Sequence, residues 1–178
     1  MYPLRPRRTA LAFLLLMLPL ALLGGWVLAQ STGPAPAAPA AATPLREPGR
    51  LTLAAYNVEW MLDVFDDPYT QDEMRPPKPR EKLEALARVI RSSQADVVAF
   101  EELENEGLLR AFAHELLADE GFRYIACVAT NSARGQNLGL ISRVPIVSLT
   151  SHRWQELSLP DVPDKRWEFA RDLVQVRL

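Results

Sequence analysis

Cysteine is nearly absent from this sequence of 178 residues, which contains only Cys127. No intrachain disulfide can form, and because Cys127 lies in the apolar run of residues 122–129, we expect a small buried side chain of a strand. A basic excess is also missing, since there are 20 basic and 22 acidic residues. Without the three arginines of the N-terminal segment, 17 basic residues face 22 acidic ones, a balance of −5. This charge does not suggest non-specific nucleic-acid binding, although a local basic patch remains compatible with it.

The first 29 residues have the pattern of a targeting segment. Three arginines precede an uncharged apolar run of residues 9–29, and Val27-Leu-Ala29 fits a small-residue cleavage site before Gln30. The pattern predicts a secretory signal peptide; an uncleaved anchor is the alternative, because the run approaches the roughly 20 residues that span a bilayer. Either arrangement predicts an exported domain, periplasmic or extracellular, or one anchored to a membrane and facing outward.

A biased stretch separates this segment from the folding part of the chain. Residues 30–49 are mostly Ala, Pro, Gly, Thr and Ser without apolar periodicity, and they predict an extended linker. The folding part is residues 50–178, long enough for one modest core. Because the chain ends inside a predicted strand, we expect a truncated product or a fragment of a longer domain.

Apolar periodicity predicts a domain that contains both helices and strands. Residues 80–91 carry apolar side chains at helical spacing, and residues 105–119 repeat the pattern. Polar loops are predicted for residues 63–79 and for the stretch before the last strand. Strands are predicted at residues 51–59, 96–100, 122–129, 138–142, 146–150 and 172–178, with 138–142 and 146–150 paired to each other.

Oxygen-rich side chains lie at the ends of the first two predicted strands. Asn57 and Glu59 end the first strand, Glu101 and Glu102 follow the second, and a predicted helix joins the two. A strand, a crossover helix and a strand bring both ends to one edge of a sheet, where carboxylates suit a hard cation such as Mg²⁺. Two alternatives remain open. Asn57 and Glu59 are also typical turn-forming or solvated residues, and the glutamates, with Glu104, also favour the start of the following helix.

Three motifs occur in order along the folding part: Tyr56-Asn-Val-Glu59, Asp96-Val-Val-Ala-Phe-Glu-Glu-Leu-Glu-Asn105 and Gly135-Gln-Asn-Leu-Gly-Leu-Ile-Ser-Arg-Val-Pro-Ile146. Together they resemble the endonuclease/exonuclease/phosphatase superfamily, which includes exonuclease III, deoxyribonuclease-I-like enzymes, inositol polyphosphate 5-phosphatases and neutral sphingomyelinases. The resemblance covers residues 51–178, about the first half of the family's domain. It implies an α+β fold, a four-layer α/β sandwich, apparently truncated mid-domain.

The resemblance implies a Mg²⁺-dependent phosphodiesterase, with Mn²⁺ or Ca²⁺ as alternative ions. Glu102 matches the glutamate that binds the metal, Asn57 matches the asparagine beside the scissile phosphate and the ion, and Glu59 matches a supporting acidic position. The family usually has Gln where this chain has Glu101, which makes the site one charge more negative. Arg171 matches a recurring basic position, to which we assign no role at this stage.

A general base is the part of the family's machinery that this sequence lacks. The resemblance implies an aspartate–histidine pair and an Asp-x-Asn motif in the second half of the domain, whereas His114 falls on a predicted helix and His152 in a loop. This chain by itself is therefore expected to be inactive, and two functions stay open for the protein. The first is a phosphoesterase whose partner is a phosphodiester substrate, nucleic acid included. The second is an inactive fragment or tethered binding domain. A membrane partner is expected only if the N-terminal segment stays uncleaved.

A run of basic residues precedes and opens the first predicted helix. It consists of Arg75, Lys78, Arg80 and Lys82. The run is compatible with a phosphate-facing lip, and also with an ordinary solvated loop and helix start.

Overall fold

The computed structural model describes residues 43–71 and 75–178. The predicted signal peptide or anchor, residues 1–29, and residues 30–42 of the predicted linker lie outside the described residues. Within those two described ranges, no helix combines the length and the apolar character needed to cross a membrane.

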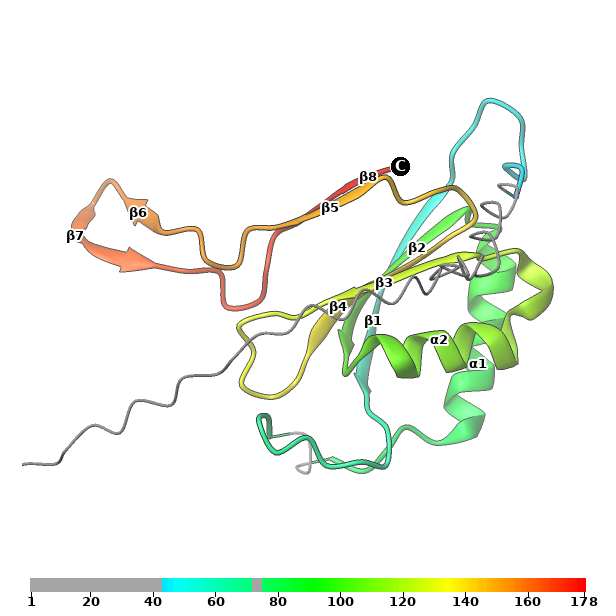
Figure 1. The fold of residues 1–178 in the computed structure, drawn as a ribbon, viewed down its shortest axis with the longest axis horizontal. Helices are drawn as coiled ribbons and strands as arrows, with labels where there is room; N and C mark the ends of the chain where they lie inside the picture. The colour runs from blue at the N-terminus through cyan, green and yellow to red at the C-terminus, as the bar shows by residue number, and fades with distance from the viewer. Residues whose placement is uncertain (1–42, 72–74) are drawn as a thin grey trace, which may run out of the picture. The chain divides into compact units, whose positions relative to one another are not determined.

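A mixed four-stranded sheet lies at the centre of the fold, in the order β1–β2–β4–β3 (Figure 1). β1 (Leu53–Met61) and β2 (Val97–Leu103) are parallel and are joined by α1 (Arg80–Ser93). β4 (Asn137–Ser142) runs antiparallel to both β2 and β3 (Tyr124–Val128). The predicted strand, crossover helix and strand are therefore confirmed, and their parallel pairing brings the two strand ends to one edge of the sheet.

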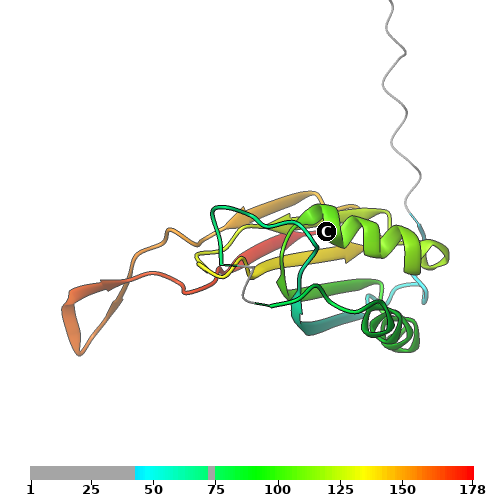
Figure 2. The same ribbon diagram turned by 90° about the horizontal axis from the view of Figure 1, so that it is seen from below.

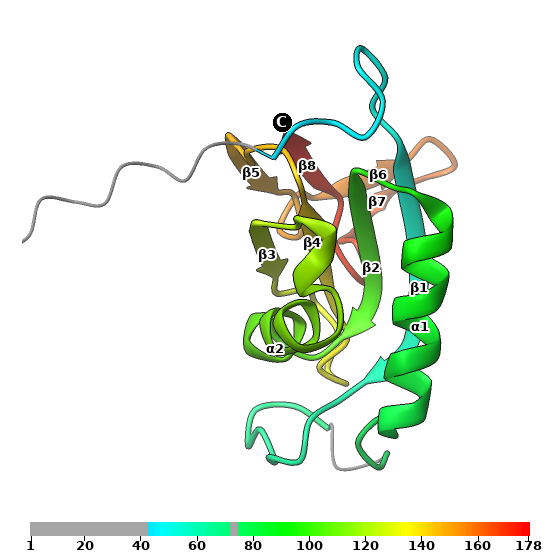
Figure 3. The same ribbon diagram turned by 90° about the vertical axis from the view of Figure 1, so that its right-hand side faces the viewer.

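Two helices cover one face of this sheet (Figure 3). α2 (Glu106–Leu116) begins after Asn105, whose side-chain oxygen accepts a hydrogen bond from the Leu108 N–H at 2.8 Å, and a 3₁₀ turn, η2 (Ala118–Glu120), follows it. The predicted inward faces of both helices are confirmed. The buried side chains that they contribute are Leu86, Ala87, Ile90, Leu109, Phe112 and Ala113.

Alternate residues of the sheet face its two sides, as the pleat requires. On the helix side, Phe100 of β2 packs edge-to-face on Phe112 of α2, with ring centroids 6.4 Å apart. Cys127 of β3 packs against the same core as predicted, although its side chain is only partly buried. Leu138 and Leu140 of β4 face the other side, where they line an apolar hollow.

Two short antiparallel ladders follow the main sheet. β5 (Ser148–Ser151) pairs with β8 (Val174–Arg177). The prediction that residues 138–142 pair with residues 146–150 is wrong, because β4 stays in the main sheet between β2 and β3. The physical reason lies in the connection. β4 ends at Ser142, whose hydroxyl donates to the Val144 carbonyl at 2.7 Å, and Pro145, which has no N–H for a ladder, follows before the chain enters the second layer.

A second ladder occupies part of the predicted loop between β5 and β8. β6 (Leu157–Leu159) pairs with β7 (Val162–Trp167) in a hairpin (Figure 2). The loop prediction is wrong for these residues, because β6 is only three residues long and mostly exposed, so it has no buried alternation to reveal it. The last strand starts at Val174 rather than Asp172, because Asp172 instead accepts hydrogen bonds from the Ser151 hydroxyl and the His152 N–H.

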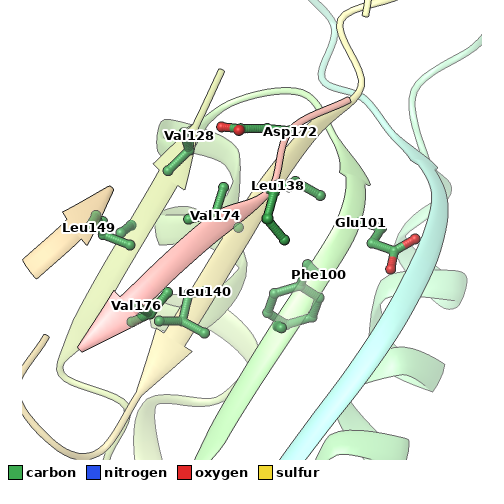
Figure 4. Close-up of a pocket in the computed structure, with 13 residues that line it drawn as sticks. Phe100, Glu101, Val128, Leu138, Leu140, Leu149, Asp172, Val174 and Val176 are labelled. Atoms are coloured by element: carbon green, nitrogen blue, oxygen red, sulfur yellow. The ribbon is translucent and has the colours of Figure 1, made fainter. Parts of the chain in front are cut away.

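The β5–β8 ladder lies over the sheet face opposite the helices (Figure 3). Val174 and Val176 of β8 line, with Leu138 and Leu140 of β4, an apolar hollow of about 270 Å³ between the two layers (Figure 4). The described residues thus form helix, sheet and ladder layers of an α+β fold. The fourth layer of the predicted sandwich is not among these residues.

A buried carboxylate fixes the segment that enters β1. Asp96 is fully buried and accepts hydrogen bonds from the backbone N–H groups of Arg46 and Thr52, at 2.9 and 3.0 Å. Arg143 lies 3.6 Å from the same carboxylate, and its guanidinium also donates to the Glu120 carbonyl. The final residues of the predicted linker are therefore attached to the folded domain.

Candidate phosphoesterase site

The parallel pairing of β1 and β2 brings the predicted site residues to one edge of the sheet. Asn57 of β1 lies beside Glu101 of β2, and Glu102 follows directly. The sheet register shifts at this level, after Asn57 on β1 and between Glu101 and Leu103 where β2 pairs with β4. Bulges of this kind bend a strand and re-aim its side chains, and they are frequent beside active sites.

Three residues at this edge have a left-handed backbone that is uncommon for residues other than glycine. Their φ angles are 50° at Glu59, 60° at Trp60 and 66° at Glu102. Each such conformation costs on the order of 1–3 kcal/mol, and surrounding structure must maintain it. Two of these three positions are predicted metal-site residues, so the strain coincides with the predicted site.

The Asn57 side chain is partly committed to the local backbone. Its oxygen accepts a hydrogen bond from the Glu59 N–H at 2.8 Å, while the residue remains exposed. The hydrogen bond fixes the orientation of the amide, because an Asn oxygen that accepts leaves the NH₂ group as the available donor. Asn57 can therefore offer the neutral donor that a phosphate oxygen requires.

Lys78 connects the two acidic strand ends electrostatically. Burial lowers the pKa of the Lys78 amine, and the nearby Glu59 carboxylate opposes that shift. Lys82 lowers the pKa further, and Glu102 raises it. Both carboxylates therefore stabilise the charged form of Lys78. With Asn57, Glu59 and Lys82 it lines a hollow of about 270 Å³, called here the Asn57 hollow.

Glu102 faces a second cation, Arg171, from the segment before β8. A guanidinium nitrogen of Arg171 lies 3.6 Å from the Glu102 carboxylate, and another donates to the Ser132 hydroxyl at 2.8 Å. Glu102 and Arg171 line a second hollow of about 270 Å³, called here the Glu102 hollow. The sequence left Arg171 without a role, and the structure places it beside the predicted metal ligand.

Gln136 is a residue of this hollow that the sequence did not indicate. Its side chain lines the Glu102 hollow and is only 2% exposed. Its amide oxygen is buried and has no hydrogen-bond partner among the described residues. An unpaired buried acceptor is costly, and such groups in native structures commonly indicate an ion, a water or a ligand that completes them.

Glu104, the third glutamate of the motif, lines neither hollow and stabilises the local structure. It is buried, and its carboxylate accepts a hydrogen bond from the Asp63 N–H at 2.6 Å. The Asn105 amide donates to the Asp63 carboxylate at 3.1 Å, while the Asn105 oxygen caps α2. Glu104 therefore holds the loop after β1 against the end of β2.

The two histidines lie apart from these hollows, whereas part of the basic run does not. His114 is exposed on α2, and His152 is bonded through its backbone to Asp172. Within the described part of the chain, neither histidine lines the Asn57 or the Glu102 hollow. Of the basic run, Lys78 and Lys82 line the Asn57 hollow, whereas Arg80 pairs with glutamates of α1 and α2.

The donor set fits a magnesium ion that is held by few protein ligands. The described residues hold no cluster of three or more His, Cys, Asp or Glu side chains suited to a metal. Mg²⁺, however, usually keeps several waters and is held by one or two carboxylates together with substrate phosphate. Glu102 supplies such a carboxylate, and the orphaned amide oxygen of Gln136 lines the same hollow, so the residues present are compatible with the ion.

Comparison with known proteins agrees with this geometry. No curated protein and no solved structure gives a significant match to the chain. The model of the Endonuclease/Exonuclease/phosphatase family matches residues 54–177, which is more than half of the chain and includes both hollows. The three motifs, the parallel β1–β2 pair and this match agree, and the chain belongs to the endonuclease/exonuclease/phosphatase family.

Proposed function

We propose that this protein is a Mg²⁺-dependent phosphodiesterase. The family consists of hydrolases that act on phosphodiesters or phosphate esters, and its members generally use divalent metals. One observation carries the finer proposal. Asn57 and Glu102 lie on neighbouring parallel strands where the regular pairing stops, and the cations Arg171 and Lys78 come from distant segments to the same edge. Carboxylate, amide donor and cations together match the charges of a metal-bound phosphodiester.

Each of these side chains has a distinct role in the proposal. Glu102 holds Mg²⁺, and Glu59 adds negative charge nearby. When bound, the ion neutralises charge on the phosphate oxygens and positions the ester for in-line attack. The Asn57 amide donates to a phosphate oxygen without the repulsion that another carboxylate would bring. Arg171 and Lys78 attract the anionic diester.

The test compares Mg²⁺-dependent hydrolysis of bis-p-nitrophenyl phosphate by the full chain and by Glu102→Gln. We expect the substitution to lower kcat/KM on the order of 100-fold, because the ion supplies several kcal/mol and each 1.4 kcal/mol is a factor of ten. The matched control is Glu168→Gln, which makes the same change at an exposed position outside both hollows. Undiminished activity of Glu102→Gln at limiting Mg²⁺ would remove Glu102 from the site.

A second candidate function is a tethered binding domain without turnover. It is favoured by one observation: within the described ranges, no histidine lines either hollow to serve as a general base. General-base catalysis contributes about 10²–10⁴-fold in rate. A chain that binds Mn²⁺ through Glu102 but hydrolyses no phosphodiester would support this candidate over the first.

We further propose that the domain acts outside the cytoplasm. The support is the arginine-led apolar run of residues 9–29 and the biased stretch that follows it. A linker of this composition holds a domain away from the surface to which the N-terminal segment directs it.

A further inference from the structure

Two arginines approach the indole ring of Trp60, which follows Glu59 in the sequence. The guanidinium carbon of Arg75 is 5.6 Å from the centroid of the indole ring, and that of Arg134 is 6.0 Å from it. Trp60 directly follows Glu59 and is half-buried, whereas both arginines are exposed. An aromatic ring and two cations are therefore available to a ligand next to Glu59, a residue of the predicted site.

The two arginines come from separate loops that contact each other. The Gln71 N–H donates to the Ala133 carbonyl at 3.0 Å. Gly135 approaches Thr70 so closely that an added Cβ would lie 3.2 Å from the Thr70 hydroxyl oxygen, and its φ of 68° favours glycine. The loop that carries Arg134 is thus fixed against the loop after β1, so Arg134 keeps its place near Trp60.

The arginine contacts are weak enough for a ligand to replace. Both distances are close to the roughly 6 Å limit for attraction between a cation and a ring, and an exposed contact of this kind corresponds to only about a 2- to 5-fold effect. A nucleobase stacked on an aromatic side chain contributes about 5- to 150-fold in affinity. A base can therefore displace a guanidinium from Trp60, and the released arginine can then pair with the adjoining phosphate.

We propose that Trp60, Arg75 and Arg134 form a binding site for single-stranded nucleic acid next to the phosphoesterase site. The inference rests on the proposed function and names its substrate class. A choline headgroup is itself a cation, so the two arginines beside the ring would repel it. An inositol phosphate offers phosphate but no planar ring to stack. An unpaired base linked to phosphate satisfies both the indole and the guanidinium groups.

The experiment measures binding of a short fluorescein-labelled oligothymidylate to the full chain, by fluorescence anisotropy in EDTA so that hydrolysis plays no part. Trp60→Ala should raise Kd about 5- to 150-fold, and Trp60→Phe should retain most of the affinity because it retains a stacking ring. Arg134→Ala should lower the slope of log Kd against log salt concentration by about 0.7, as expected for one lost phosphate contact with a single strand.

Matched controls distinguish this site from general effects. Trp167→Ala and Arg166→Ala make the same changes on the exposed β7 strand and should leave Kd unchanged. Equal losses in these controls, or an unchanged Kd in both Trp60→Ala and Arg134→Ala, would overturn the proposal. The same holds if inositol hexaphosphate competes as well as unlabelled oligothymidylate, or if the chain binds phosphatidylcholine vesicles and no oligonucleotide.

The outcome is separable from that of the proposed function. Glu102→Gln should bind the oligonucleotide in EDTA at least as tightly as the unsubstituted chain, because neither Trp60 nor its two arginines depend on the metal and the substitution frees Arg171 for phosphate. Loss of hydrolysis in Glu102→Gln with undiminished oligonucleotide binding supports both proposals. Normal hydrolysis of bis-p-nitrophenyl phosphate in Trp60→Ala, together with weakened oligonucleotide binding, assigns Trp60 to substrate selection and excludes a purely structural role.

Discussion

Replacing Arg171 should change metal binding and turnover in opposite directions. Arg171 lies 3.6 Å from the Glu102 carboxylate, so it competes with a metal ion for that carboxylate. In Arg171→Ala, the carboxylate loses this competitor, and the hollow becomes one charge more negative. We expect tighter binding of a divalent cation and slower hydrolysis, because the phosphate loses a cation that attracts it.

The size of each effect follows from the exposure of the pair. The two side chains are 39% and 21% exposed, and solvent-accessible pairs of this kind contribute about 0.2–1 kcal/mol. Removing the competitor should therefore strengthen metal binding by about 1.5- to 5-fold. A hydrogen bond to a charged group contributes about 1.5–3 kcal/mol, so losing an arginine–phosphate contact should reduce kcat/KM by about 10- to 150-fold.

The assay titrates Mn²⁺ into the full chain by electron paramagnetic resonance and measures hydrolysis of bis-p-nitrophenyl phosphate in parallel. Arg171→Lys should keep the charge but lose the fork that also donates to Ser132, and we expect intermediate values for both quantities. Weaker Mn²⁺ binding in Arg171→Ala would refute the reasoning, since it would show that Arg171 supports Glu102 rather than competing for it.

Three further predictions concern the core and the N-terminus. Burial, and secondarily Glu106, raises the pKa of the Cys127 thiol from 9.0 to about 12. At pH 8, iodoacetamide should therefore label Cys127 roughly 10³-fold more slowly than a free thiol. Because the unfolded chain loses the thiol proton at a lower pH than the folded chain, this thiol should lower the free energy of unfolding only as the pH rises from about 9 towards 12. Gly139→Ala should lower the free energy of unfolding by about 1–3 kcal/mol, measured by urea denaturation, because an added Cβ would collide with a methyl carbon of the fully buried Leu103; an unchanged urea midpoint would contradict this packing. Mass spectrometry of protein from its native host should find Gln30 at the N-terminus, whereas an intact leader would indicate an anchor.

Much of the sheet and both helices were predictable from local pattern. Residues 80–91 carry their apolar side chains at i, i+3, i+4 and i+7, and the structure buries that face in α1. The short apolar run of residues 96–100 predicted a buried strand, and β2 lies between two other strands. These elements bury enough apolar side chains for their period to be visible in the sequence.

The two strands of the second layer were predicted, but their pairing with each other was not. β5 and β8 are four residues each, mostly half-buried or exposed, and their partners lie more than 20 residues apart. Proximity in sequence favoured pairing residues 138–142 with residues 146–150, and that choice ignored the break at Pro145. Pairing across such distances depends on tertiary packing against β4. The periodicity of apolar residues along the sequence carries no information about that packing.

The residues of the proposed site also differ in whether the sequence indicates them. Asn57, Glu59 and Glu102 were predicted as site residues because they lie at the ends of two predicted strands, and such ends meet at one edge of a sheet when a helix joins the strands. Lys78 and Arg171 reach that edge from a proline-rich loop and from the segment before β8, positions that only the folded chain brings together. Gln136 carried no signal at all, because a single glutamine before a strand is unremarkable until its oxygen is found buried and unpaired.

Under the proposed function, in which Glu102 holds the metal, the contact between Glu102 and Arg171 has a consequence for how metal and substrate bind. Without a ligand, the Glu102 carboxylate is neutralised by Arg171, so neither charge is fully available to a partner. A metal ion that takes the carboxylate frees the guanidinium, and a phosphate that takes the guanidinium frees the carboxylate. Each ligand therefore removes the competitor of the other, and by linkage the two must strengthen each other's binding by the same factor. A site arranged in this way favours the metal and the phosphodiester bound together over either one alone.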